Sequence, residues 1–246
     1  MNLFITGISR GLGKEMVLYF TKKGHKVFGI SINEPDYLKE INAEKTGFYI
    51  GSVTDDSDLK NAVEKGIEFL GKVDVLINNA ALKLFKMPDE ITEDEYKEAI
   101  NTNLTSQILL CRRMIPHFLK NKSGKIINIA SNAGMTSYKE GTAYCSSKAG
   151  LIAYSQSLAK YLNDKNISVN VVSPPTFSTE DYKNDYPNLD HSRLLQSDRV
   201  IKVIDYIISS DKFFTGKNFP MFKFKSLLKY TVLKNLELMG YLFQKK

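Results

Sequence analysis

Short apolar segments rich in isoleucine and valine alternate along the chain with longer segments of helical pattern. The apolar segments are residues 2–6, 26–31, 47–51, 73–78, 125–130 and 167–173. The helical segments are residues 12–23, 35–43, 55–70, 92–120 and 143–164. Apolar runs of this length without polar alternation are typical of strands buried on both faces. The alternation therefore predicts a parallel sheet covered by helices on both sides.

Two helical segments begin with residues that commonly cap helix N-termini. Asp55 opens the segment 55–70, and Thr92 begins the capping box Thr92-Glu93-Asp94-Glu95. The chain has neither internal repeats nor a low-complexity linker. We therefore predict one α/β domain over residues 1–220, with a doubly wound parallel sheet of the Rossmann type.

Residues 221–246 have a different pattern. The stretch 217–246 contains seven lysines and one glutamate, and so holds +6 of the net charge of +7. One apolar stripe recurs at three- and four-residue steps: Leu228, Val232, Leu236, Met239 and Phe243. This pattern predicts a basic amphipathic helix. It could dock on its own or a neighbouring subunit, or meet an anionic membrane surface or an acidic carrier protein.

The composition is that of a globular protein, with 43% hydrophobic and 25% charged residues among 246. No run of 18 apolar residues and no secretory signal is present, so we expect a cytoplasmic protein. Two cysteines fit a reducing compartment, and they and three scattered histidines suggest no metal site. Because the excess charge is confined to the tail, we expect no nucleic-acid binding.

A glycine-rich turn, TGISRGLG at residues 6–13, joins the first predicted strand to the first helix. Glycines here let the backbone approach a ligand, and the helix N-terminus offers free N–H groups to a pyrophosphate. The alternative is a turn that only reverses the chain. Dinucleotide binding predicts cofactor contacts from Gly7, Ser9, Arg10, Gly11, Leu12 and Gly13.

The residues after the second strand bear on which dinucleotide is bound. Ser31, Ile32 and Asn33 stand where an acidic residue would take a ribose 2′-hydroxyl. Arg10 in the glycine turn could meet a 2′-phosphate, although it could also be a solvated turn residue. This charge pattern favours NADP(H) over NAD(H).

Tyr144 and Lys148 lie four residues apart at the start of a helical segment. A phenol has a pKa near 10, so proton transfer at neutral pH needs assistance. An ammonium on the same helix face would stabilise the phenolate and lower the pKa of Tyr144. The alternative is a half-buried aromatic beside a solvated lysine.

Further motifs follow in order along the sheet: Asn78-Asn79-Ala80, Asn103, Ser131, Tyr144, Lys148 and Asn170-Val171-Val172-Ser173-Pro174. With the glycine turn, this series closely resembles the short-chain dehydrogenase/reductase family over about residues 2–219. The resemblance is to its single-domain branch, similar to 3-oxoacyl-[acyl carrier protein] reductase-like members. It implies a seven-stranded doubly wound sheet, a homodimer or homotetramer, and hydride transfer between NADP(H) and a carbonyl or alcohol.

The resemblance also assigns roles. Tyr144 would be the acid–base residue, and Lys148 would support it and bind the nicotinamide ribose. Ser131 would hold the substrate oxygen, and Asn103 would hold a helix kink and a proton-relaying water. Further cofactor contacts are implied for residues matching family positions: Ser31, Ser52, Val53, Asn79, Ala80, Pro174, Phe177 and Thr179.

Three departures from the family pattern stand out. Ala81 replaces a glycine after Asn78-Asn79-Ala80, and the family's acidic-glycine-glycine ending is absent. Pro175 replaces the glycine after Pro174, which fixes φ and removes an N–H in the loop facing the nicotinamide. Cofactor contacts there would then rest on the Phe177 N–H and the Thr179 hydroxyl.

The substrate is not identified by the sequence. Residues 177–197 match the variable substrate loop, and residues 82–87 and 133–138 are expected to line the same cleft. Acyl thioesters, polyketide-like ketones and sugar-derived ketones remain open. Two other functions also remain: epimerisation or dehydration through transient hydride transfer, and non-catalytic sensing of NADP(H).

Overall fold

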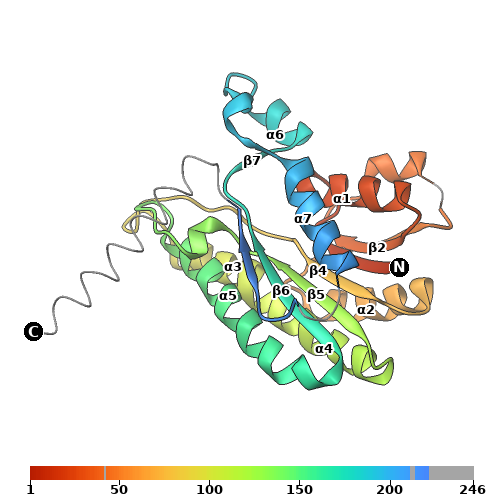
Figure 1. Cartoon of the computed structure of the whole chain (residues 1–246). Helices are drawn as coiled ribbons and strands as arrows, with labels where there is room; N and C mark the ends of the chain where they lie inside the picture. The colour runs from red at the N-terminus through yellow and green to blue at the C-terminus, as the bar shows by residue number, and fades with distance from the viewer. Residues whose placement is uncertain (42, 211–213, 222–246) are drawn as a thin grey trace, which may run out of the picture.

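The computed structural model describes residues 1–41, 43–210 and 214–221. Its main sheet has the strand order β3-β2-β1-β4-β5-β6-β9, and every neighbouring pair is parallel (Figure 1). The strands are β1 Asn2–Thr6, β2 Lys26–Ser31, β3 Thr46–Ile50, β4 Val75–Asn78, β5 Gly124–Ile129, β6 Ile167–Ser173 and β9 Asn218–Pro220. The predicted doubly wound sheet of seven strands is confirmed.

The helices that cover this sheet are α1 Gly11–Lys22, α2 Asp56–Leu70, α3 Glu93–Ile100, α4 Ser106–Lys120, α5 Thr142–Leu162 and α7 Ser197–Ser209. Both predicted caps are confirmed. The Asp55 carboxylate accepts a hydrogen bond from the Asp58 N–H at 2.9 Å, and Thr92 and Glu95 form the reciprocal capping box. These caps satisfy N–H groups that a helix leaves free at its start.

The side chains of β1 alternate between two separate apolar layers. Leu3 and Ile5 pack in one layer with α1 and α7, whereas Phe4 packs in the other with α2, α4 and the end of α5. Figure 1 shows these helices on opposite sides of the sheet. Because both faces are covered, the strands read as continuous apolar runs in the sequence.

Two predicted helices differ from the structure. The segment 35–43 forms only a 3₁₀ helix at Asp36–Glu40, because Ile41 is already extended and the Tyr37 hydroxyl is held by the Ile8 carbonyl at 2.7 Å. The segment 92–120 is not one α-helix, since a π-helical turn at Asn101–Thr105 separates α3 from α4.

The segment 177–197, expected as a variable loop, contains regular structure. It holds the short pair β7 (Phe177–Ser178) and β8 (Leu195–Gln196), with α6 (Glu180–Asp185) between them. The predicted tail helix lies in residues 222–246, outside the described residues. Within the described ranges no helix is long and apolar enough to cross a membrane, and no group of three or more His, Cys, Asp or Glu residues could hold a metal ion.

The strand order reverses between β1 and β4, and this reversal locates the site. The chain leaves β1 toward β2 and β3, then returns to β4 and continues toward β5 and β6. The connections therefore diverge at the carboxyl ends of β1 and β4, where open α/β sheets bind ligands. The glycine-rich turn and Asn79 both follow directly from these strand ends.

Candidate functional site

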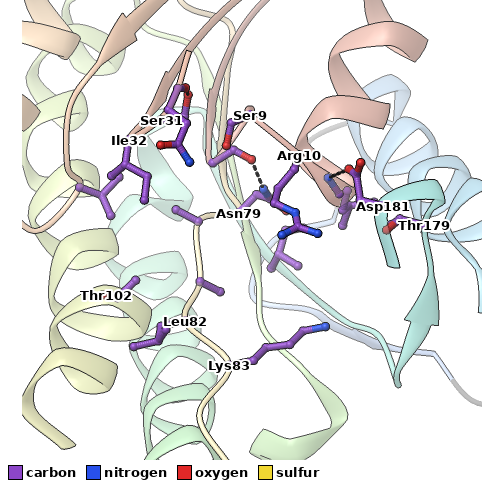
Figure 2. A pocket seen from close by; sticks show the side chains of 18 of the residues that line it. Ser9, Arg10, Ser31, Ile32, Asn79, Leu82, Lys83, Thr102, Thr179 and Asp181 are labelled. Atoms are coloured by element: carbon purple, nitrogen blue, oxygen red, sulfur yellow. Dashed lines mark hydrogen bonds between the residues drawn. The ribbon is translucent and has the colours of Figure 1, made fainter. Parts of the chain in front are cut away.

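A cavity of about 680 Å³ opens at the carboxyl ends of the central strands (Figure 2). It is lined by every residue predicted to contact the cofactor except Gly13 and Pro174. Tyr144 and Lys148 also line it, whereas Asn103 and Ser131 do not. One continuous cavity thus joins the glycine turn to the predicted catalytic tyrosine.

The glycine turn leaves backbone accessible at one end of the cavity. Gly7 and Gly11 have φ of +72° and +59°, a region that favours glycine. A Cβ at Gly7 would lie 2.9 Å from the Ala80 Cα, and one at Gly13 would lie 1.9 Å from the Gly7 oxygen. Glycine is therefore required for α1 to start this close to β1 and β4.

The Asn79 side chain fixes the glycine turn from the neighbouring strand end. Its amide donates to the carbonyl oxygens of Thr6 and Gly7 at 2.9 and 3.1 Å. The Thr6 hydroxyl in turn accepts from the N–H groups of Asn79 and Ala80, both at 2.9 Å. These bonds hold the turn in place, a role for Asn79 that no local sequence pattern indicates.

The end of β2 supplies the cavity with neutral groups. The Ser31 hydroxyl donates to the Asn33 carbonyl at 2.8 Å, and Ile32 is exposed beside it. The Ser52 N–H is held by the Asp58 carboxylate at 2.8 Å. Ser31, Ile32 and Asn33 include no carboxylate that would repel a ribose 2′-phosphate.

Two carboxylates from α6 contact the glycine turn, and no pattern in the sequence predicted either contact. Asp181 accepts a hydrogen bond from the Gly11 N–H at 2.5 Å, and Asp185 forms an ion pair with Arg10. Figure 2 shows Asp181 next to the turn. Arg10 is therefore paired with a carboxylate of the chain, while 60% of its side-chain surface remains exposed.

Lys148 is buried within α5, with 1% of its surface exposed. Its Nζ donates to the Ile129 carbonyl at the end of β5 at 2.9 Å and lies 5.9 Å from the centroid of the Tyr144 ring. Burial, with the nearby charge of Lys83, lowers the pKa of Lys148 to about 7. Lys148 therefore titrates near neutral pH.

The pKa of Tyr144 differs from the expectation. Burial raises it above the usual value, and a hydrogen bond with Ser131 opposes this only in part. The prediction that Lys148 lowers the Tyr144 pKa is wrong for this arrangement, because desolvation of the phenolate is the largest effect. Tyr144 accordingly holds its proton at neutral pH.

Ser131 and Asn103 do not line the cavity but lie next to residues that do. The Ser131 hydroxyl accepts from the Ala133 N–H at 3.1 Å. Asn103 is fully buried in the π-helical turn, where its side chain accepts from the Leu82 N–H and donates to the Leu82 carbonyl, both at 2.8 Å. Asn103 thus fixes the loop after β4, a contact that no local pattern indicates.

The loop after β4 brings two side chains to the site, Lys83 and Phe85, which the sequence analysis included only as part of the segment 82–87. The Phe85 ring lies 5.2 Å from the Tyr144 ring, centroid to centroid, and Lys83 lines the cavity. The Lys86 N–H donates to the Glu140 carbonyl at 2.8 Å, which joins this loop to the segment before α5. The expectation that residues 82–87 and 133–138 line one cleft is met only in part, because Leu82 and Lys83 line the cavity whereas none of residues 133–138 does.

The reversed sheet, the glycine turn and the continuous cavity define a dinucleotide-binding protein of the Rossmann class. The chain belongs to the short-chain dehydrogenase family, whose model it matches over residues 2–189.

Among curated relatives, the 3-oxoacyl-[acyl-carrier-protein] reductase FabG of Haemophilus influenzae is 30% identical over 223 residues, covering 84% of this chain and 90% of the relative. The reductase of the same name from Buchnera aphidicola is 33% identical over 217 residues, covering 84% and 88%. A solved structure described as ElxO with NADP bound aligns with a TM-score of 0.81 at 26% identity, covering 89% of this chain and 96% of that one.

Family membership makes this chain an NAD(P)-dependent oxidoreductase that acts on small molecules. The residues present fit such a cofactor. The cavity is continuous from the glycine turn to Tyr144, and the close approaches at Gly7 and Gly13 bring the start of α1 to the ends of β1 and β4.

The buried Lys148 gives a testable dependence of stability on pH. Between its folded pKa of about 7 and its usual value of 10.5, the unfolded chain binds a proton that the folded chain lacks. The free energy of unfolding should therefore rise with pH in this window, by roughly 1 kcal/mol per pH unit from this group. Urea unfolding from pH 7 to 9 should show a shallower rise for Lys148→Met than for the unaltered protein. Equal slopes would contradict the assigned pKa.

Proposed function

We propose that this protein reduces a carbonyl compound with NADPH, with Tyr144 as the acid–base residue. The observation that carries the proposal is the buried Lys148, held by the Ile129 carbonyl beside Tyr144 in a cavity that reaches the glycine turn. Burying an ammonium is costly, and such costs are concentrated at functional sites.

The residues would divide the proton chemistry among them, while the bound cofactor supplies the hydride. Tyr144 keeps its proton at neutral pH and donates it to the carbonyl oxygen of the substrate. Lys148 has a pKa of about 7, so it is suited to hold a proton near Tyr144 and to release it after the transfer. Ser131 orients the Tyr144 hydroxyl and the substrate oxygen.

Besides the helix kink and the relay water that the family resemblance implies, Asn103 has a second role in this proposal. Its amide is engaged by both backbone groups of Leu82, so it positions the loop that walls the substrate side of the cavity. A water-mediated proton relay from Asn103 to Lys148 remains part of the proposal.

The choice of NADPH rests on Arg10 and on the neutral end of β2. A 2′-phosphate would meet the Arg10 guanidinium and no carboxylate from Ser31, Ile32 or Asn33. The NADP named for the similar ElxO structure supports the same choice. The names of the curated relatives further favour a 3-oxoacyl substrate. A homodimer or homotetramer is the assembly we propose.

Replacing Tyr144 with Phe tests the mechanism. We expect turnover with NADPH and a reducible ketone to fall by about a hundredfold or more, since general acid catalysis typically contributes that much. The dissociation constant for NADPH, measured by cofactor fluorescence, should stay within about twofold, because the phenol is not needed to bind phosphates. Tyr161→Phe, an exposed position on the same helix, is the matched control.

Equal turnover by the Tyr144→Phe and unaltered proteins would exclude this tyrosine as the proton donor. Tighter binding of NADH than NADPH would overturn the argument from Arg10. If the protein binds NADPH but none of the ketones supports NADPH oxidation, it would instead be a sensor. The departure from the family pattern at Pro174-Pro175 would favour that function.

A further inference from the structure

Lys83 lies on the loop after β4 and points across the cavity (Figure 2). Its Nζ lies 5.6 Å from the centroid of the Phe177 ring and 5.4 Å from that of Tyr182. The side chain nevertheless remains accessible to solvent, so a ligand can reach it. Aromatic faces attract a cation without neutralising its charge.

The backbone next to Lys83 is fixed. Both polar backbone groups of Leu82 are held by the Asn103 amide at 2.8 Å, and Asn103 is fully buried. The ammonium thus starts from an anchored position and not from a free loop. Preorganisation of this kind lowers the entropy cost of binding.

The charge of Lys83 has no carboxylate partner in the part of the chain that the structure describes. Nearby cations do: Arg10 pairs with Asp185, Lys14 with Asp181 and Lys86 with Glu95. Lys83 also acts electrostatically on Lys148, so two cations share one end of the cavity. An anion bound at this end would relieve their repulsion.

We infer that Lys83 is a specificity-determining residue that selects carbonyl substrates carrying a carboxylate or phosphate group. This inference rests on the proposed function. The cofactor phosphates belong at the glycine turn, whereas Lys83 contacts Phe177 and affects Lys148 at the Tyr144 end. The exposed Phe85 ring on Tyr144 provides an apolar wall for the remainder of the substrate.

The test compares ketone acids with their esters: levulinate with methyl levulinate, and acetoacetate with methyl acetoacetate. The unaltered protein should oxidise NADPH with a higher kcat/KM for each acid than for its ester. Lys83→Met should reduce kcat/KM for the acids by about tenfold, mainly through KM, and leave the esters unchanged. Lys83→Arg should retain part of the preference, and Lys86→Met on the same loop is the charge-matched control.

No preference for the acids in the unaltered protein, or an undiminished preference in Lys83→Met, would overturn this inference. Calorimetric titration of levulinate into the protein with NADP⁺ tests the anion site without turnover, and weaker binding is expected for Lys83→Met. Binding without NADPH oxidation by any of the four ketones would count against the proposed reaction while supporting the role of Lys83.

A second inference comes from α6. The Asp181 carboxylate accepts from the Gly11 N–H at 2.5 Å and lies 4.0 Å from the Lys14 Nζ, and Asp185 pairs with Arg10. The Glu180 N–H donates to the Glu15 carboxylate at 3.1 Å, which ties the start of α6 to α1. These contacts join segments that lie about 170 residues apart in the chain.

The same groups at the glycine turn are the ones proposed to bind cofactor phosphates. A carboxylate and a phosphate cannot both accept the Gly11 N–H, and an Arg10 paired with Asp185 is not free for a 2′-phosphate. We propose that Asp181 and Asp185 are internal competitors of the cofactor, so that NADPH entry requires α6 to leave the turn. This inference also rests on the proposed function.

Replacing both aspartates with asparagine should tighten NADPH binding by about tenfold, because charge-assisted bonds that oppose binding are removed. Glu180→Gln on the same helix is the control, since its side chain pairs with Lys183 and not with the turn. Cofactor fluorescence gives the dissociation constants, and melting temperatures verify folding. Unchanged or weaker binding by a folded double variant would overturn the competition. If the unaltered protein binds neither NADPH nor NADH, the proposed function fails instead.

Discussion

The site depends on one buried cation, the Lys148 ammonium. Its hydrogen bond to the Ile129 carbonyl connects the second turn of α5 to the carboxyl end of β5. The same four-residue step that buries Lys148 brings Tyr144 to the cavity wall. An uncompensated buried charge is costly, so burial lowers the pKa of Lys148 and favours its neutral form. Tyr144 keeps its proton at neutral pH because of its own burial in the same cavity wall.

The charges around the cavity are divided between its two ends. At the glycine turn, Arg10 and the Gly11 N–H are balanced by the carboxylates of α6. At the other end, Lys83 and Lys148 are not balanced by carboxylates of the described chain. Tyr182 of α6 contacts Lys83, so movement of this short helix affects both ends. Binding of an anionic cofactor and of an anionic substrate are therefore linked through one segment.

The sheet was predictable because its signal is local. Strands such as β1 are apolar throughout since both faces are covered, and the caps at Asp55 and Thr92 follow from side-chain chemistry at the helix start. The spacing of Tyr144 and Lys148 allowed either a proton-transfer pair or an aromatic beside a solvated lysine, and the ordered series of motifs favoured the pair. The π-helical turn at Asn101–Thr105 lies where the family resemblance implied a helix kink at Asn103, but the helical pattern of the sequence did not indicate it.

Contacts between distant segments explain most of what the sequence did not reveal. Three such contacts join Asp181 to Gly11, Asn103 to Leu82 and Lys148 to Ile129, and their partners lie between 19 and 170 residues apart in the sequence. The direction of the Tyr144 pKa is a similar case, because burial is a property of the whole fold.

Direct hydride transfer from NADPH to a carbonyl is tested by following the C4 hydrogen of the cofactor into the product. A reducible ketone should be incubated with the protein and NADPH carrying deuterium at either face of C4, and the alcohol analysed by mass spectrometry. One of the two labelled cofactors should deliver a single deuterium to the carbinol carbon. An alcohol without deuterium from either cofactor would contradict direct hydride transfer in this cavity.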